Sequence, residues 1–154
     1  MVGKALVSEL KLKKDIRLLT PTKKELNYLN FEDVDKYFKS KRPNFVYIVA
    51  AKVGGILANK ENKIEYFENN QLIQINLFKC INKYKVKKSI FLGSSCIYPK
   101  NAKQPIKENY LLTSPLEKTN EAYALAKIVG LKACDFYNQQ YKTNYFTLMP
   151  CNLY

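Results

Sequence analysis

The stretch Phe45-Val46-Tyr47-Ile48-Val49-Ala50 decides the fold. All six side chains are apolar or aromatic, without the alternation of polar and apolar residues that marks a strand with one face in water. The run follows Pro43 and precedes the pair Gly54-Gly55. A short, continuous apolar run bounded in this way is typical of a parallel strand with helices on both faces. We therefore predict a strand over 45–50.

Helical and strand-like patterns alternate on both sides of this strand. The spacing of apolar residues predicts helices, and short apolar runs predict strands. The expected helices cover residues 2–10, 31–39 with Asn30 as N-cap, about 65–84 and about 121–140, and the other expected strands cover 16–20, 89–92 and 145–149. This alternation predicts an α/β fold, a Rossmann-like parallel sheet with right-handed crossovers and helices on both faces.

The loops that follow three of these strands are candidates for a ligand site. In open parallel sheets, ligands bind beyond the carboxyl ends of the strands. That rule places Ala50–Gly55, Gly93–Cys96 and Pro150–Leu153 along one rim of the sheet. We expect these three segments to face the same ligand.

Composition narrows the class of protein. The chain has 154 residues, 47% of them hydrophobic, which is enough for one domain with a buried core. Its net charge is +13, but the lysines are scattered and only Arg17 and Arg42 are arginine, so we expect no nucleic-acid partner. Residues 1–14 lack the apolar centre of a signal peptide, and no apolar stretch reaches the length of a membrane span. We expect a cytoplasmic protein without a membrane partner.

The cysteines do not form a metal-binding pattern. Cys80, Cys96, Cys134 and Cys151 contain no C-x-x-C pair, and the sequence has no histidine. An ordinary zinc site needs such ligands at close spacing. We expect four reduced thiols and no metal.

Tyr123 and Lys127 are candidate acid–base residues. They are four residues apart in a predicted helix, so their side chains project from one face about one turn apart. An ammonium group near a phenol lowers the pKa of that phenol and makes it a proton donor or acceptor near neutral pH. Ser94, at the end of a buried strand, would bring a hydroxyl to the same rim. Considered alone, the pair is more typical of two surface residues of an amphipathic helix.

Four longer motifs carry a resemblance to a known family. They are Ala50–Gly55, Gly93–Lys100, Thr119–Lys127 and Met149–Tyr154. In this order they resemble the GDP-L-fucose synthase family of the short-chain dehydrogenases/reductases, from about Lys41 to the end of the chain. The resemblance implies NADP(H) as cofactor and a GDP-sugar as substrate. The reaction implied is the conversion of GDP-4-keto-6-deoxymannose to GDP-L-fucose, by epimerisation at the two carbons beside the ketone and reduction of that ketone.

The resemblance also assigns roles to individual residues. Tyr123 would protonate the ketone oxygen, Lys127 would tune Tyr123 and hold the nicotinamide ribose, and Ser94 would hydrogen-bond the ketone. Cys96 would be the base for epimerisation, although a small core residue is the common reading of such a cysteine. The residues implied in cofactor binding are Val2, Gly3, Lys23, Ala50, Ala51, Leu92, Gly93, Lys127, Pro150, Asn152 and Leu153.

The choice between NAD and NADP can be weighed from the residues themselves. A fold that selects NAD usually carries an acidic residue at the end of its second strand, where it binds the ribose hydroxyls. Here the predicted strand ends at Thr20, and the loop after it offers Lys23 and Lys24. These cations suit the additional phosphate of NADP, although ordinary solvated lysines explain them equally well.

Both ends of the chain depart from the family pattern. Met1-Val2-Gly3 resembles the last part of the family's glycine-rich loop, so we expect a cofactor domain over 1–154 that lacks its first strand and the substrate-binding domain. The histidine acid of the family is absent, and Cys151 stands where the family has threonine. We expect the isolated chain to be inactive and marginally stable or prone to aggregation, and the complete enzyme to be a homodimer.

Three other functions remain open at the level of sequence. One is a different nucleotide-sugar enzyme of the same superfamily, a 4-epimerase or dehydratase, against which Cys96 and Ala50–Gly55 argue. Another is a non-catalytic nucleotide-binding or interaction module that retains the sheet. The third is a basic nucleic-acid-binding domain, which only the net charge favours.

Overall fold

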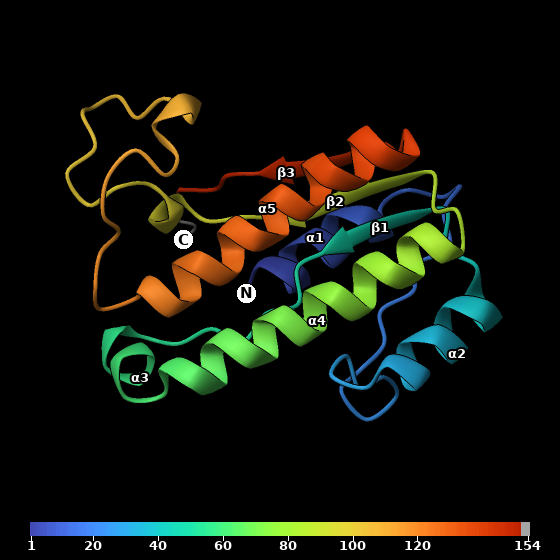
Figure 1. The fold of residues 1–154 in the computed structure, drawn as a ribbon. Coiled ribbons are helices and arrows are strands. Elements are labelled where there is room, and N and C mark those ends of the chain that lie inside the picture. The colour runs from blue at the N-terminus through green and yellow to red at the C-terminus, as the bar shows by residue number, and fades with distance from the viewer. Residues whose placement is uncertain (152–154) are drawn as a thin grey trace.

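Three parallel strands form the centre of the molecule. The computed structural model describes residues 1–151, and its strands β1 (Phe45–Ile48), β2 (Lys88–Leu92) and β3 (Tyr145–Leu148) pair in the order β1-β2-β3 (Figure 1). Val46 lies opposite Ser89 across the first pair, and Ser89 lies opposite Tyr145 across the second. The parallel pairing confirms the predicted α/β fold.

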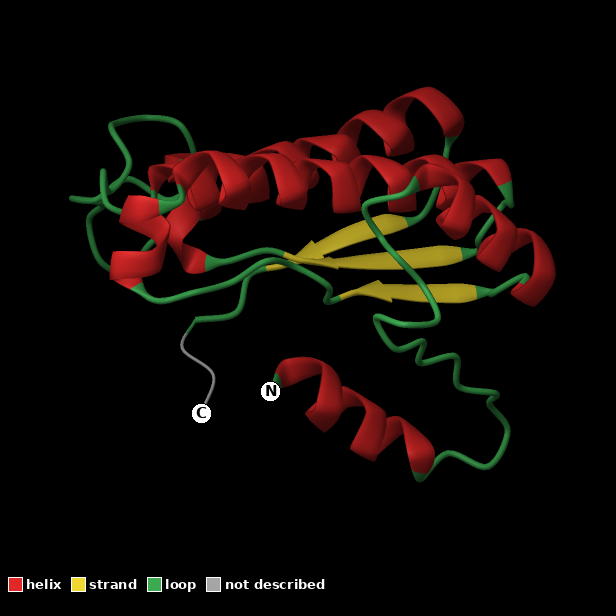
Figure 2. Ribbon diagram, turned by 90° about the horizontal axis from the view of Figure 1, so that it is seen from below, coloured by secondary structure: helices red, strands yellow, loops and turns green. Residues whose placement is uncertain are grey.

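Two long helices cover one face of this sheet. They are α4 (Lys63–Lys83) and α5 (Glu121–Tyr141), which lie side by side (Figures 1 and 2). Helix α2 (Phe31–Lys41) packs against α4. The short helix α3 (Ile56–Glu61) comes directly before α4 in the chain. Helix α1 (Val2–Lys11) lies on the opposite side of the sheet (Figure 2). The four long helices fall close to the predicted ranges, whereas α3 was not predicted.

The predicted strand over 16–20 is wrong. Residues 16–20 have no regular secondary structure and belong to the irregular connection between α1 and α2. A strand requires a neighbour that pairs with its N–H and C=O groups. Among the described residues β1 pairs only with β2, so its other edge offers no ladder that the run from Ile16 to Thr20 joins. The apolar run over 16–20 does not by itself show whether a neighbouring strand is available for pairing.

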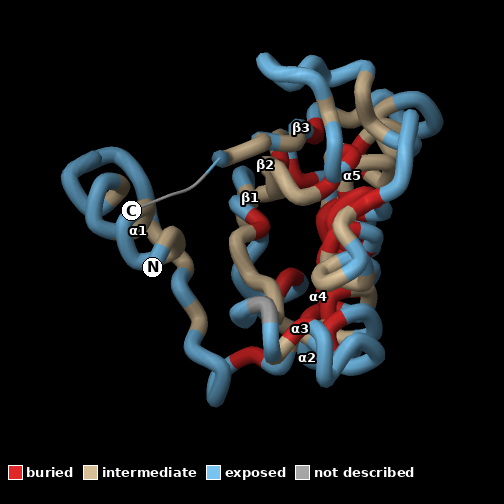
Figure 3. Tube along the Cα trace, turned by 90° about the vertical axis from the view of Figure 1, so that its left-hand side faces the viewer, coloured by how far each residue is buried: buried red, intermediate tan, exposed pale blue. Residues whose placement is uncertain are grey.

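The prediction that the strand over 45–50 is covered on both faces is also wrong. Side chains toward α4 and α5, such as Ile48, Phe91 and Tyr145, are buried. On the opposite face Phe45 is 61% exposed and Phe146 is 47% exposed. Figure 3 shows α1 on that side of the strands, away from α4 and α5. The physical reason is that α1, the helix on that side, buries none of its own residues. One face of the sheet therefore carries the core and the other remains open.

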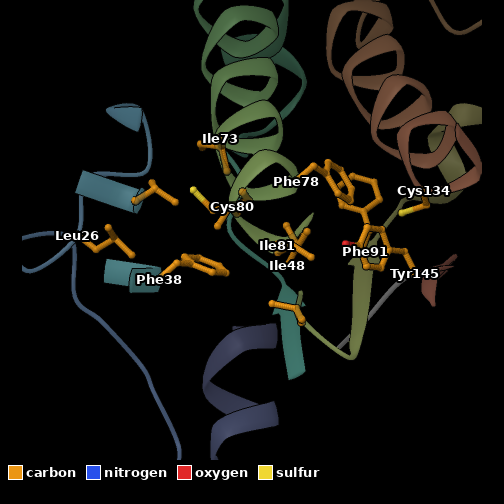
Figure 4. Packing of buried hydrophobic residues seen from close by; sticks show 13 residues of the cluster. Leu26, Phe38, Ile48, Ile73, Phe78, Cys80, Ile81, Phe91, Cys134 and Tyr145 are labelled. Carbon is orange, nitrogen blue, oxygen red and sulfur yellow. The ribbon is translucent and has the colours of Figure 1, made fainter. Parts of the chain in front are cut away.

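The core lies between the sheet and helices α2 and α4 (Figure 4). Helix α4 contributes apolar residues at helical spacing, which place them on one face of that helix. The cluster comprises Leu26, Val34, Phe38, Ile48, Ile73, Leu77, Phe78, Cys80, Ile81, Val86, Phe91, Cys134 and Tyr145. A smaller cluster of Ile97, Leu116, Ala124 and Ile128 supports the first turns of α5. This second cluster holds the candidate site in place.

The structure also describes the cysteines, the metal-ligating side chains and the character of the helices. All four cysteines are free, as expected. Within residues 1–151 no group of three or more metal-ligating side chains is close enough to hold an ion. In the same part of the chain, none of the helices has the length and apolar character that crossing a bilayer requires.

Candidate active site

The site begins where β2 ends. Gly93 follows this strand and donates its N–H to the carbonyl oxygen of Leu148, at 2.8 Å. A Cβ atom at position 93 would lie 2.6 Å from Sδ of Met149 and 3.0 Å from the oxygen of Leu148. The end of the Met149 side chain could move aside, but the backbone oxygen of Leu148 would make a tight contact, so glycine eases the approach of the ends of β2 and β3. The close approach fixes the direction in which the chain continues.

Ser94 and Cys96 lie next to each other after that glycine. The Oγ atom of Ser94 lies 3.0 Å from Sγ of Cys96 and also accepts a hydrogen bond from the Cys96 N–H, at 3.5 Å. This second bond caps the short 3-10 helix η1 (Ser95–Ile97). Ile97 is fully buried in the smaller cluster, which anchors the turn. A hydroxyl and a thiol are thereby presented together at the rim.

Lys127 reaches the same place from α5. Its side chain is only 3% exposed, and Nζ donates a hydrogen bond of 2.7 Å to the carbonyl oxygen of Leu92. Burial lowers the pKa of Lys127 to about 8, because a charged ammonium is poorly stabilised away from water. The Cys96 thiol opposes this shift by raising the pKa of Lys127. The lysine is therefore close to its titration range at neutral pH.

Tyr123 lies one helical turn before Lys127. The Lys127 nitrogen is 5.7 Å from the centre of the Tyr123 ring, so the ammonium faces the ring rather than pairing with the hydroxyl. Burial and the Cys96 thiol raise the pKa of Tyr123 to about 12, and a hydrogen bond with Ser94 lowers it only in part. The expected lowering of this pKa by Lys127 is therefore not found. Desolvation is the largest cause of the raised pKa of Tyr123.

Cys96 lies near the ammonium group of Lys127, but its thiol is not activated. Burial is the largest effect and raises the pKa of the Cys96 thiol. The hydrogen bond with Ser94 and the charge of Lys127 act in the opposite direction. The structure thus brings together the four predicted side chains, with Cys96 as a thiol and Tyr123 as a phenol.

The loop after β1 forms a second part of the rim, and a buried asparagine holds it. Asn70 on α4 is 1% exposed. Its Oδ1 accepts from the Lys52 N–H at 2.8 Å, and its Nδ2 donates to the Lys52 carbonyl oxygen at 3.0 Å and to that of Tyr66 at 2.7 Å. One side chain thus satisfies both backbone groups of Lys52. Asn70 is a site residue that the sequence alone did not indicate. Its only signal in the sequence is that it is a polar residue within an apolar helical pattern.

The end of the same loop is packed just as closely. A Cβ atom at Gly54 would overlap the Tyr66 hydroxyl, so this position requires glycine. Asn59 donates through Nδ2 to the carbonyl oxygens of Gly54 and Gly55, at 2.8 and 3.0 Å. Side chains of α3 and α4 therefore define the path of the segment that follows Ala50 and Ala51.

The other predicted cofactor residues occupy different places. Leu92 supplies the carbonyl that binds Lys127, and Pro150 follows β3 on the same rim. A Cβ atom at Gly3 would lie 3.4 Å from the side chain of Val49, which places the start of α1, including Val2, beside the end of β1. Lys23 lies on an exposed turn whose hydrogen bonds are local. Asn152 and Leu153 lie outside the described residues.

A parallel sheet with a serine, a tyrosine and a lysine at its carboxyl rim defines a Rossmann-like protein of the short-chain dehydrogenase/reductase type. The comparison with known families agrees with this class. The chain belongs to the NAD dependent epimerase/dehydratase family, whose model matches residues 1–154.

Individual relatives are similar along the whole chain. GDP-L-fucose synthase of Escherichia coli (strain K12) is 47% identical over 154 residues, which are 100% of this chain and 48% of the relative. A GDP-mannoheptose C4 reductase from Campylobacter jejuni with NADP bound has a TM-score of 0.94 and 38% identity, over 99% of this chain and 45% of that one. A GDP-L-fucose synthetase from Naegleria fowleri bound to NADP has a TM-score of 0.90 and 26% identity, over 99% and 47%. The chain spans about half the length of the curated relatives it matches.

Proposed function

We propose that this chain is the cofactor-binding part of an NADPH-dependent enzyme that converts GDP-4-keto-6-deoxymannose to GDP-L-fucose. The observation that carries the proposal is the thiol of Cys96, 3.0 Å from the Ser94 hydroxyl, at the same rim as Tyr123 and Lys127. Serine, tyrosine and lysine suffice for reduction of a ketone. A thiol among them adds a base for epimerisation. The names of the E. coli and N. fowleri relatives support GDP-L-fucose as the product.

The residues at the rim fit a dinucleotide. Ala50, Ala51 and Gly93 present little side-chain bulk there, so a ligand can approach the backbone. Residues 20–24 contain no carboxylate to repel the additional phosphate of NADP, and Lys23 and Lys24 are exposed. Lys127 uses one donor on Leu92 and has others for ribose hydroxyls. When bound, NADPH supplies the hydride for the reduction.

The chain's own groups account for the proton transfers. Cys96 would take the proton beside the ketone as a thiolate, which Lys127 and Ser94 favour and burial disfavours. Tyr123, with a pKa of about 12, keeps its proton at neutral pH and can give it to the ketone oxygen as negative charge develops there. Ser94 would donate a hydrogen bond to the same oxygen. The raised pKa of Tyr123 therefore suits a proton donor better than a base.

The activity test uses the protein as its native cells make it, with single substitutions. Tyr123→Phe should abolish reduction of the keto-sugar, whereas Tyr141→Phe, on an exposed residue of the same helix, should leave the rate unchanged. Cys96→Ser should abolish uptake of solvent deuterium into the carbons beside the ketone but retain reduction. Cys80→Ala, which removes a thiol in the core, is its control. Full epimerisation by Cys96→Ser would sink the assignment of the base.

A second candidate is a C4 reductase of another GDP-linked keto-sugar, without epimerisation. The structural similarity to the C. jejuni GDP-mannoheptose C4 reductase favours it. The two candidates differ in product, because only the epimerase exchanges protons at the neighbouring carbons. Product analysis by NMR in deuterated water separates them.

We propose that residues 1–154 form a cofactor domain within a longer polypeptide that supplies a further strand beside β1 and a substrate-binding domain. The free edge of β1 and the exposure of Phe45 and Tyr47, 61% and 42%, support this proposal, because an open apolar sheet face is costly in water. Intact mass spectrometry of the protein captured from its native cells tests it. A mass about twice that of this 17.9 kDa chain is expected from the length of the relatives. Cooperative unfolding of an isolated, soluble 154-residue monomer would contradict it.

We also propose that the complete enzyme is a homodimer that associates through α4 and α5. Leu72 and Ile75 on α4 and Val129 on α5 are each 44–45% exposed, which suits a contact between copies. Val129→Lys should shift the sedimentation coefficient to that of a monomer, whereas Lys132→Glu, beside it on α5, should not. A cytoplasmic location belongs to the same proposal, because four free thiols suit a reducing compartment.

A further inference from the structure

We propose that Phe91 is a positioning residue that holds the ammonium group of Lys127 over its ring face and keeps that group protonated. This inference rests on the proposed function, since it assumes that the charge of Lys127 is needed at the site. It concerns a residue without a polar atom, and the chemistry is the attraction between a cation and the negative face of an aromatic ring.

The surroundings of Lys127 leave few other sources of stabilisation for its charge. Its nitrogen lies 4.8 Å from the centre of the Phe91 ring and 2.7 Å from the Leu92 oxygen. Within residues 1–151 no carboxylate lies within 4.0 Å of it. The titratable groups that face it are Cys96 from η1 and Tyr123 from its own helix, and neither is charged at neutral pH. The neutral Phe91 ring and the Leu92 carbonyl oxygen therefore stabilise the ammonium group, as a carboxylate does for most buried lysines.

The ring of Phe91 is fixed in this orientation by its neighbours. Phe91 is 1% exposed, and its ring lies 6.0 Å from that of Phe78, centre to centre (Figure 4). On its other side is Gly130 of α5, where a Cβ atom would come within 2.6 Å of Cε1 of Phe91. Because Gly130 lies three residues after Lys127, the missing side chain leaves space for the ring beneath the lysine. The surface of α5 at Gly130 therefore fits the Phe91 ring next to the ammonium group of Lys127.

The charge of Lys127 is finely balanced, which makes the contribution of the ring measurable. Burial already brings the pKa of Lys127 down to about 8. A cation–π contact is worth enough to move a pKa by about half a unit to one and a half units. The ring face therefore opposes the lowering of the Lys127 pKa that burial causes.

The test measures the titration of Lys127 directly, in the full-length protein that carries this chain. Lysine labelled with carbon-13 at Cε is titrated by NMR, and the Lys127 signal is assigned from its absence in Lys127→Arg. Site-specific replacement of Phe91 by 3,4,5-trifluorophenylalanine keeps the shape of the ring but removes the negative charge of its face. Phe91→Leu removes the ring altogether. The same two replacements at Phe38, which belongs to the same core but stacks on Tyr84 and not on Phe91, are the matched controls.

We expect both replacements at Phe91 to lower the pKa of Lys127 by about half a unit to one and a half units, and those at Phe38 to leave it within about 0.2 unit. An unchanged pKa in the trifluoro variant would overturn the proposal, and so would equal shifts at positions 38 and 91. Because the readout is a pKa and not turnover, it can fail while the proposed reaction stands. Conversely, inactivity of the unsubstituted enzyme on the keto-sugar would leave this result intact.

Discussion

The ammonium nitrogen of Lys127 lies 2.7 Å from the carbonyl oxygen of Leu92, the last residue of the central strand β2. This bond ties α5 to the rim and places a nearly inaccessible charge beside Ser94 and Cys96. The charge costs stability because it has left water and no carboxylate among residues 1–151 lies within 4.0 Å of it. The site is therefore expected to reduce the stability of the fold that carries it.

Replacing the charge should stabilise the protein in a pH-dependent way. The pKa of Lys127 falls from 10.5 to about 8, so the unfolded chain binds more protons than the folded one between these pH values. The cost of the charge is thus fully present below pH 8 and disappears as the pH rises toward 10.5. At pH 7 we expect Lys127→Met to raise the free energy of unfolding by about 1–3 kcal/mol, after the loss of one hydrogen bond.

Urea unfolding of both proteins from pH 6 to pH 10.5 measures this difference. Lys132→Met, at a half-buried lysine of the same helix, serves as the control and should show little change. A difference between Lys127→Met and the parent that stays constant over the whole range would show that the ammonium is not the cause.

Gly130→Ala should destabilise the protein, although alanine favours helices. In an open helix this exchange stabilises by about 1 kcal/mol. At position 130 the new methyl group would overlap Phe91 and the side chain of Gln74, so α5 must move away from the sheet. We expect a net loss of about 1–3 kcal/mol in thermal or urea unfolding. Gln139→Ala, on an exposed turn of α5, should change stability by less than about 0.5 kcal/mol, and a stabilised Gly130→Ala would contradict the close contact.

Lys142→Gly should raise stability. Lys142 ends α5 in the left-handed conformation, with φ of 54°, while its N–H bonds to the Asn138 oxygen. Glycine adopts this conformation without steric cost, so we expect a gain of about 0.5–1 kcal/mol. Arg42 has a similar φ of 48°, but its side chain donates to the Lys39 oxygen and lies 4.8 Å from the centre of the Tyr84 ring. Arg42→Gly should gain less, and equal gains at both positions would mean that these contacts contribute nothing.

Asn70→Leu should release the loop after β1. Leucine has nearly the same volume but leaves both backbone groups of Lys52 without their partner, which costs about 2–4 kcal/mol. Hydrogen exchange of the Lys52 amide should accelerate in this variant at denaturant concentrations where the rest of the sheet remains protected. Asn69→Leu changes the neighbouring, less buried asparagine and should leave that amide protected. Unchanged exchange in Asn70→Leu would show that other contacts hold the loop.

Much of the fold could be predicted because its strands are short, apolar and separated by clear breaks. The runs around Ile48 and Phe91 were recognised for this reason, and their parallel pairing followed from the helices between them. The run over 16–20 has the same composition but forms no strand, because pairing depends on a neighbour and not on the segment itself. The exposure of one sheet face could not be predicted for a similar reason, because the strand sequences do not determine where α1 lies.

The candidate site could be predicted in its members but not in its electrostatics. Ser94, Cys96, Tyr123 and Lys127 were chosen from motifs, and the structure gathers them at one rim. The direction of the Tyr123 pKa shift was wrong, because burial is set by packing that no local spacing reveals. For the same reason, the sequence did not indicate that Phe91 and Asn70 belong to the site. Each acts through contacts with residues distant in sequence.

The most direct test of the central claim is the reaction of the protein from its native cells with GDP-4-keto-6-deoxymannose and NADPH in deuterated water, followed by NMR of the product. The account predicts GDP-L-fucose that carries deuterium at both carbons beside the former ketone, and a reduced but non-epimerised sugar without deuterium there from Cys96→Ser. A product reduced without any deuterium at these carbons in the unsubstituted protein, or no reduction at all, would contradict it.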